Sequence, residues 1–219
     1  MDYLIVACHT LENELKAALP CCTRSYDLAW IDAQLHNVKS RFRDAVQEIL
    51  DGSDGYQAVL FATSFCGNAV QGLQARGAPL VIPRVDDCIS LLLGGVQKKH
   101  RLLSSYFLTD GWLRGRDNIW NEYQRAIRRY GEETAQQIFQ VMLSNYRKLT
   151  LLDTGCYDLE ASKVQAAPIA DAFSLELTVE PASIDYLRRL LTGPWEPEQF
   201  LTVPPHETIT GELLTQLYQ

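Results

Sequence analysis

Short apolar runs alternate with amphipathic helical patterns through the first half of the chain, and this alternation constrains the fold more than any other feature. Each run is brief and nearly free of polar side chains, which is typical of a buried strand. We expect strands at residues 3–8, 28–35, 58–64 and 78–84. Because strands separated by helices pair in parallel through right-handed crossovers, the sequence predicts an α/β fold with a mostly parallel sheet and helices on both faces.

Helical patterns fill the intervals between these strands. Thr10 can cap a helix whose apolar residues share one face, and the apolar spacing over 38–50 predicts an amphipathic helix that ends at the turn 51–55. We expect a further helix after the third strand, running through Leu73, and another that begins at Cys88.

The second half changes rhythm but keeps the same two kinds of element. A short strand and turn at 105–112 precede two longer helical patterns, and strands at 148–155 and 175–181 enclose a helix around 158–173. The sequence therefore predicts a helical insertion around 113–148 and possibly two α/β halves, 1–105 and 106–219, within a single α/β domain over 1–219. We expect the proline-rich tail after 193 to pack as an irregular strap.

Composition excludes some classes of protein. Hydrophobic residues make up 47% of the 219 residues, which is ample for a core and excludes a disordered chain. The formal net charge of −7 disfavours nucleic-acid binding, which needs a basic face for phosphates. No signal peptide or bilayer-spanning run is visible, so we expect a cytoplasmic protein without a membrane partner. In the cytoplasm the six cysteines are more typical of free thiols or metal ligands than of disulfides.

Reactive side chains follow the strands, each just past a predicted carboxyl end. In open α/β sheets this edge is where ligands bind, so residues remote in sequence can meet there. The residues in such positions are Cys8, His36, Asn37, Cys66, Gly67, Asp86, Asp87, Cys88, Asp110 and Asp153.

Cys66 stands in the stretch "LFATSFCGNAVQGL", where an apolar run stops and a helix is expected to begin. The first N–H groups and the dipole of such a helix stabilise a thiolate and lower its pKa. Gly67 permits a tight turn and lets a ligand approach the backbone. The alternative is a small buried cysteine at a close contact between helix and strand, and Cys88 allows the same two interpretations.

Three thiolates and a histidine match a tetrahedral zinc site or a site for a softer metal. We predict as metal ligands Cys8, His36, Cys66 and Cys88. The predicted catalytic residues are Cys66, Asp87 and Asp153, and the predicted cofactor-binding residues are Asn37, Gly67 and Asn68. Other interpretations stay open: Cys8 as a core residue, His36 as a capping or surface residue, and Asp153 as the cap of a turn through its own side chain.

Several segments, in the same order and over nearly the whole chain, resemble the bacterial and archaeal domain-of-unknown-function family sixteen-thirty-eight. They are "IVACHTLENEL", "LHNVKSR", "SFCGNAVQGL", "PLVIPRVDDCISLLLGG", "YFLTDGW", "YGEETA", "LLDTG" and "LLTGPWEPEQFLTVPPHETI". The family pattern carries cysteine at Cys8, Cys66 and Cys88, and departs from this chain at His9 and Asp86. The resemblance implies a link to one-carbon metabolism through corrinoid proteins and their methyltransferases.

Three functions follow from these features. The first is a metal- or thiolate-centred protein acting in methyl transfer with a corrinoid on a partner protein, with zinc as a possible cofactor. The second is a non-enzymatic metallochaperone or small-ligand binding protein. The third is a hydrolase that uses Cys66 as nucleophile with His36, which needs a hydrogen-bonded thiol–imidazole pair and an oxyanion hole. The sequence leaves the substrate and the oligomeric state open.

Overall fold

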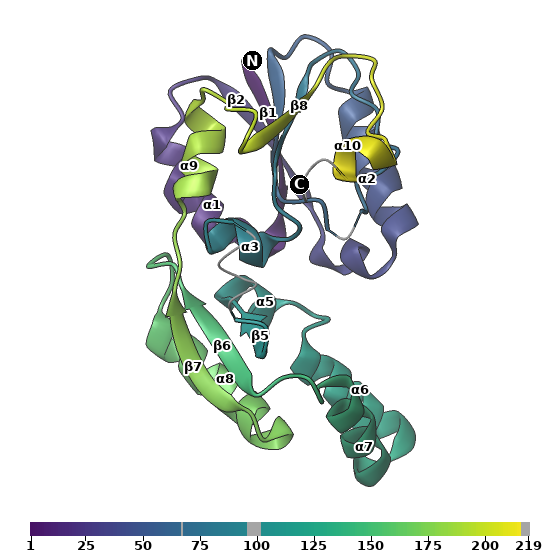
Figure 1. Ribbon diagram of the computed structural model, residues 1–219, viewed down its shortest axis with the longest axis vertical. Helices are drawn as coiled ribbons and strands as arrows, with labels where there is room; N and C mark the ends of the chain where they lie inside the picture. The colour runs from purple at the N-terminus through teal and green to yellow at the C-terminus, as the bar shows by residue number, and fades with distance from the viewer. Residues whose placement is uncertain (67, 96–101, 216–219) are drawn as a thin grey trace.

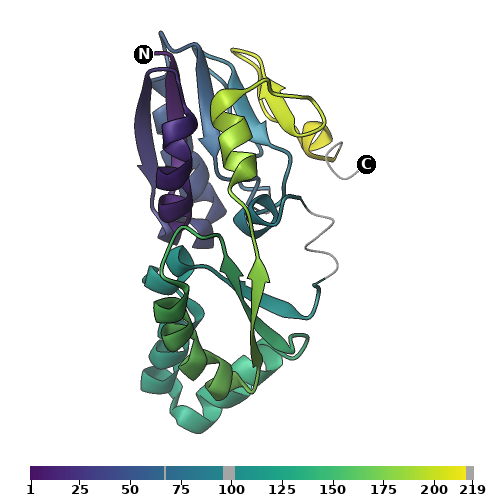
Figure 2. The same cartoon turned by 90° about the vertical axis from the view of Figure 1, so that its left-hand side faces the viewer.

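The computed structural model describes residues 1–66, 68–95 and 102–215, which form two lobes (Figure 1). The first lobe contains the chain up to residue 95 and again from residue 184. The second lobe contains residues 102–181. The chain returns from the second lobe to the first after β7 (Glu176–Pro181), as the side view of Figure 2 shows.

The first lobe is built on one mostly parallel sheet with the strand order β2-β1-β3-β4-β8. β1 pairs in parallel with β2 and β3, and β3 with β4, whereas β8 pairs antiparallel with β4. The strands are β1 (Tyr3–Cys8), β2 (Tyr26–Ile31), β3 (Ala58–Ala62), β4 (Leu80–Pro83) and β8 (Phe200–Val203). The expected irregular strap at the tail was therefore wrong in part, because Phe200–Val203 adds an edge strand to the sheet.

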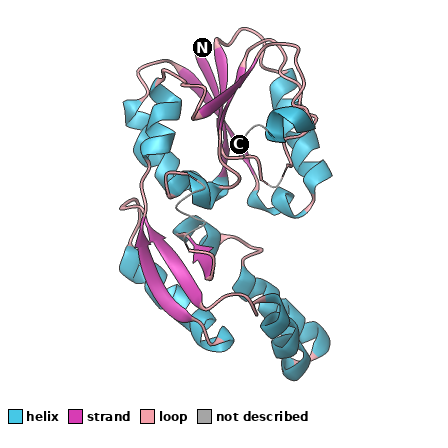
Figure 3. Ribbon diagram, viewed as in Figure 1, coloured by secondary structure: helices cyan, strands magenta, loops and turns pink. Residues whose placement is uncertain are grey.

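Helices cover both faces of this sheet (Figure 3). Side chains alternate along β1, so that Ile5 and Ala7 pack in one core cluster while Leu4 and Val6 pack in the other. The first cluster is closed by α1 (Glu12–Ala18), α3 (Cys88–Leu92) and α9 (Asp185–Thr192), and the second by α2 (Lys39–Asp51) and α10 (Gly211–Thr215). The short 3₁₀ helices are η1 (His9–Leu11), η2 (Leu19–Cys21) and η3 (Ala33–Asn37). The predicted fold class is confirmed.

The second lobe has its own parallel sheet in the order β5-β6-β7. Its core is rich in aromatic rings: Phe139 and Phe173 stack with centroids 5.4 Å apart, and Tyr123 packs edge-on against both. The strands are β5 (Ser105–Leu108), β6 (Lys148–Asp153) and β7 (Glu176–Pro181). The helices are α5 (Asp110–Arg114), α6 (Ile119–Tyr130), α7 (Glu132–Met142) and α8 (Leu159–Phe173).

The two lobes do not coincide with the halves expected at residue 105. The second lobe ends near residue 181, and α9, β8 and α10 return to the first lobe. The lobes also share a core, because Leu152 at the end of β6 is fully buried in the cluster of α1, α3 and α9. A hydrophobic pattern shows that a strand is buried but not which sheet it joins, so the return of the chain was not visible.

The expected helix after β3 is absent from the described residues between β3 and β4, which form turns instead. Cys66, Asn68 and Gly72 have φ angles of 46°, 68° and 90°. Such left-handed residues interrupt a right-handed helix, because they aim the following peptide groups away from its hydrogen-bond ladder. Separately, none of the helices in the described ranges is long and apolar enough to cross a bilayer.

Candidate functional site

The carboxyl ends of the parallel strands in both lobes meet between the lobes. Gly111, which follows β5, lies so close to Thr10, which follows β1, that a Cβ built on the glycine would be 2.1 Å from the Thr10 carbonyl oxygen. Thr154, which follows β6, donates a 3.0 Å hydrogen bond to Glu14 Oε1 on α1. Two strand-end edges therefore face one another, and this edge is where α/β sheets bind their ligands.

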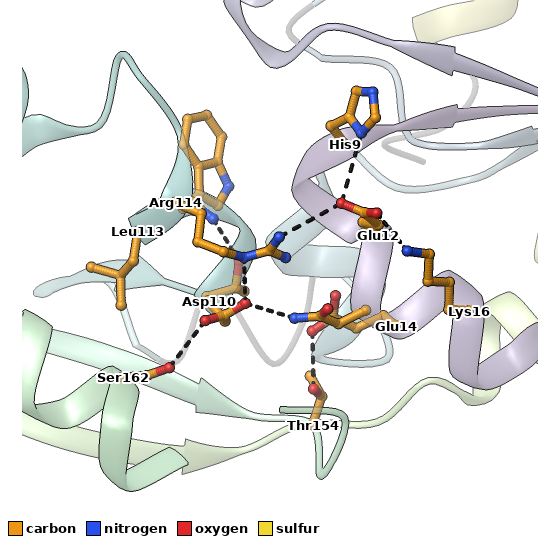
Figure 4. A network of polar contacts seen from close by, with 12 residues as sticks. His9, Glu12, Glu14, Lys16, Asp110, Leu113, Arg114, Thr154 and Ser162 are labelled. Carbon is orange, nitrogen blue, oxygen red and sulfur yellow. Dashed lines mark hydrogen bonds and ion pairs between the residues drawn. The ribbon is translucent and has the colours of Figure 1, made fainter. Parts of the chain in front are cut away.

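A polar network joins the lobes beside this contact (Figure 4). Asp110 at the start of α5 accepts hydrogen bonds from Asn13 at 2.6 Å, from Arg114 of its own helix at 2.7 Å and from Ser162 of α8 at 3.4 Å. Arg114 also lies 3.6 Å from Glu12 on α1. The network holds the first turn of α5 against α1 and thereby sets the width of the gap between the lobes.

Glu14 lies at the centre of this contact and is fully buried. Its Oε2 has no hydrogen-bond partner among the described residues. Burial raises the pKa of Glu14 above its ordinary value, and the negative charge of Asp110 raises it further, while the hydrogen bond from Thr154 lowers it. The contact between the lobes thus contains an acid that holds its proton more tightly than an exposed carboxyl group does.

Two cavities open on either side of this contact. The smaller, about 220 Å³, lies between the ends of β1 and β2 and the segment 111–117 of the second lobe. The larger, about 620 Å³, lies between Asp86, Asp87 and Cys88 of the first lobe and the walls of the second. Trp112 and Asp117 line both cavities. A cavity of this size can take a small molecule.

Cys88 is the first residue of α3, and its thiol lies in the wall of the larger cavity. Asp87 caps the helix by accepting a 2.8 Å hydrogen bond from the backbone N–H of Ser90. Burial raises the pKa of the Cys88 thiol, and so does the charge of Asp87, while a hydrogen bond from the indole N–H of Trp112 lowers it. The contact with Trp112 joins the two lobes at the thiol.

Cys66 is partly buried on the opposite side of the sheet from the α3 cluster. Its sulfur lies 3.4 Å from the hydroxyl of Ser64 and 3.6 Å from that of Thr63. The expected helix dipole is missing, since the described residues on either side of position 67, Cys66 and 68–73, form no helix. Burial raises the pKa of Cys66, the two hydroxyls lower it, and the charge of Asp87 raises it. The predicted activation of Cys66 by a helix was therefore wrong.

The three predicted cysteine ligands lie near one another at the sheet edge. Cys88 is close enough to Cys66 and Cys8 for both to raise its pKa, and Asp87 acts on Cys66 and Cys88 alike. Cys8 is buried and accepts a 3.1 Å hydrogen bond from Thr10 Oγ1. Even so, no three side chains of His, Cys, Asp or Glu in the described ranges are placed to hold one metal ion. The predicted set also contains His36, whose side chain lies outside the described residues, so the zinc site stays a prediction.

The other predicted site residues are distributed around this edge. Asp153 accepts a 3.0 Å hydrogen bond from the backbone N–H of Gly155, which is the turn-capping alternative, and it lines neither cavity. Asn68, like Cys66, has a backbone in the left-handed region, with a φ angle of 68°. His36 and Asn37 end η3 at the carboxyl end of β2, but the structure does not describe their side chains, and Gly67 lies outside the described residues.

Sequence reasoning did not assign a role to the residues that join the lobes. Trp112, Glu14 and Asn13 were not among the predicted site residues, and Asp110 was noted only as following a strand. The signal was present in "TDGW", because these residues, 109–112, come directly after the strand 105–108. Their role became visible only when the structure showed that the strand ends of the two sheets face each other.

This fold and this site define a two-lobed α/β protein with a ligand-sized cleft between facing strand ends. A family model described as "Protein of unknown function (DUF1638)" matches residues 30–191, and the chain belongs to this family. The resemblance seen in the sequence is confirmed. A search of curated proteins finds no match, and neither does a search of solved structures.

Proposed function

We propose that this protein binds a small molecule in the cleft between its lobes and that the ligand meets the Cys88 thiol. The observation that supports this function best is the larger cavity, which lies where the strand ends of both lobes face each other and has Cys88 in its wall. Ligands of α/β proteins bind at such edges because loops from several strands converge there.

The thiol-centred chemistry of the sequence analysis stays within this proposal. Asp87 and Cys88 line the larger cavity, so a ligand there lies against both, and Cys66 influences Cys88 electrostatically from behind this wall. Methyl transfer with a corrinoid on a partner protein, and a zinc ion on the thiols, remain hypotheses about what this group meets. The hydrolase hypothesis has less support, because burial raises the pKa of Cys66 where a nucleophile needs the thiolate.

Protection of Cys88 from alkylation tests the proposal. The full chain is screened by thermal shift against small molecules of varied charge, and each hit is then added during treatment with iodoacetamide. Peptide mapping by mass spectrometry follows each cysteine separately. At about ten times its dissociation constant, a cleft ligand slows modification of Cys88 about tenfold. Cys21 in η2, which lines neither cavity, serves as the internal control.

Two results contradict the proposal. The first is that the molecules found in the screen stabilise the protein but do not change the alkylation rate of Cys88. The second is that they stabilise a Trp112→Ala variant of unchanged secondary structure as much as they stabilise the natural chain. Elemental analysis of the same preparation checks the metal hypothesis, and near-stoichiometric zinc that is lost in the Cys66→Ser, Cys88→Ser double variant supports it.

A further inference from the structure

The wall that the second lobe contributes to the larger cavity is aromatic. Tyr106 on β5 and Tyr146 before β6 pack edge to face, with ring centroids 5.5 Å apart and an interplanar angle of 83°. Trp112 lines the same cavity from α5. The faces of such rings carry partial negative charge, so an aromatic wall attracts a positively charged group that has lost its water.

A carboxylate stands in the same wall. Glu122 on α6 lines the cavity and acts on the phenol of Tyr106, whose pKa burial and Glu122 together raise to about 12. In the described part of the chain, the Glu122 side chain has no hydrogen bond or ion pair. The other lining carboxylates have partners: Asp117 pairs with Arg125 at 2.9 Å, and Asp86 accepts a hydrogen bond from Ser90. Glu122 is therefore the carboxylate that a ligand can neutralise.

Glu122 decides which charge on a ligand the cavity favours, because the other three carboxylates of the described lining, Asp86, Asp87 and Asp117, already have partners. A bound anion would meet the carboxylate of Glu122 and the aromatic faces, both of which repel it. A neutral ligand would cover the half-buried carboxylate of Glu122 without giving it a partner, which is unfavourable.

From these contacts we propose that the ligand of the larger cavity is an organic cation, an ammonium group with apolar substituents, held by Glu122 and the rings of Tyr106, Tyr146 and Trp112. The apolar substituents follow from the remaining lining, in which Ile89, Leu108 and Ile119 contribute hydrocarbon. The inference rests on the proposed function, since it names the class of molecule that lies against Cys88.

A matched set of three probes tests the charge alone. Choline is the cation, dimethylbutanol is its neutral analogue with carbon in place of nitrogen, and dimethylbutyrate is an anion with the same branched end. Binding to the full chain is measured by calorimetry and by ligand-observed NMR at constant ionic strength. We expect choline to bind about tenfold more tightly than dimethylbutanol, and dimethylbutyrate to bind more weakly than either.

Two variants then locate the site. Glu122→Gln keeps the size of the side chain and removes its charge, and should weaken choline about tenfold while leaving dimethylbutanol unchanged. Glu132→Gln makes the same change at an exposed position at the start of α7, outside the cavity, and should change neither. Circular dichroism and thermal unfolding show whether each variant is folded.

The outcomes separate this inference from the proposed function. Equal affinities for choline and dimethylbutanol, or tighter binding of dimethylbutyrate, overturn the organic cation, as does choline binding that Glu122→Gln leaves intact. If a neutral or anionic molecule nevertheless protects Cys88 from alkylation, the proposed function survives this failure. If choline binds through Glu122 but leaves Cys88 as reactive as before, the cation site stands and the thiol-centred function fails.

Discussion

The side-chain amide of Asn13, on α1 of the first lobe, donates a 2.6 Å hydrogen bond to the carboxylate of Asp110, the first residue of α5 in the second lobe. Asp110 also accepts from Arg114 and Ser162, so one carboxylate connects α1, α5 and α8. Trp112 lies one helical turn or less from this anchor and lines both cavities. The geometry of the cleft thus depends on a contact between two residues, Asn13 and Asp110, that line neither cavity.

Replacing Asp110 with Asn should loosen this contact. The amide keeps the shape but loses the charge that strengthens the bonds from Asn13 and Arg114. We expect a loss of about 1–3 kcal/mol in the free energy of unfolding, measured by urea denaturation. Asp44→Asn on the exposed side of α2 is the matched control and should change stability by less than about 0.5 kcal/mol. Equal effects of the two changes would show that Asp110 does not anchor the lobes.

Adding a methyl group at Gly111 tests the close approach of the two strand ends. A Cβ there would lie 2.1 Å from the Thr10 carbonyl oxygen and 2.7 Å from its carbon, so the backbone itself must move. Gly111→Ala should destabilise the protein by about 1–3 kcal/mol, although alanine favours a helix. It should also enlarge the radius of gyration measured by small-angle X-ray scattering.

Gly52→Ala is the control for that change. Gly52 ends α2, and a Cβ there meets nothing nearer than 3.6 Å. Its effect on stability should stay within about 0.5 kcal/mol. If Gly111→Ala is as mild as Gly52→Ala and leaves the scattering unchanged, the lobes have room to adjust and the contact does not determine the cleft.

The sequence was sufficient to predict the elements but not the way two lobes meet. Apolar periodicity placed β1, β3, β4 and β6 because their burial is a local pattern of side chains. It failed between β3 and β4, where the left-handed backbones of Cys66 and Asn68 end any helix without an obvious local signal. The role of Asp110 was invisible for another reason: its partner Asn13 is distant in sequence, and only the packing of two sheets joins them.

The candidate site stays a prediction, but the expectation behind it has a simple physical reason. Parallel strands end at one edge, so the residues after them, Cys8, Cys66 and Cys88, were expected to converge. In the structure Cys8 ends β1, Cys66 follows β3 and Cys88 follows β4, all three being strands of the first-lobe sheet. The arrangement of ligands around a metal, by contrast, depends on side-chain directions that strand order does not determine.

The buried carboxyl of Glu14 should make stability depend on pH. Its pKa is raised from 4.5 in the folded chain, so the folded state holds this proton more tightly than the unfolded state. The resulting stabilisation is complete below the unfolded pKa and is lost as pH rises through the folded pKa, with a slope of at most about 1.4 kcal/mol per pH unit.

A Glu14→Gln variant removes that dependence, because glutamine keeps an acceptor for Thr154 and carries no charge. The stability of the variant relative to the natural chain should therefore rise as pH increases from about 4.5 towards neutrality. Asp110, Arg114, Cys156 and Tyr157 surround Glu14 electrostatically, and they are unchanged in the variant. Urea denaturation across this pH range checks the result, and a constant difference between the two proteins would contradict it.

The thiols of Cys66 and Cys88 should be protonated at neutral pH in the ligand-free protein. Burial raises the pKa of both, and Asp87 adds to the effect on each. Only the thiolate form of a cysteine reacts with iodoacetamide. The modification rate of each thiol should therefore keep rising about tenfold per pH unit beyond pH 9, the ordinary pKa of a cysteine, and peptide mapping measures this rate. In the urea-unfolded chain the same rates should level off near that value. A native rate that levels off at lower pH than the unfolded one would mean that the free protein already stabilises the thiolate. In that case a positive charge or a metal at this edge, rather than an incoming ligand, would have to provide the stabilisation.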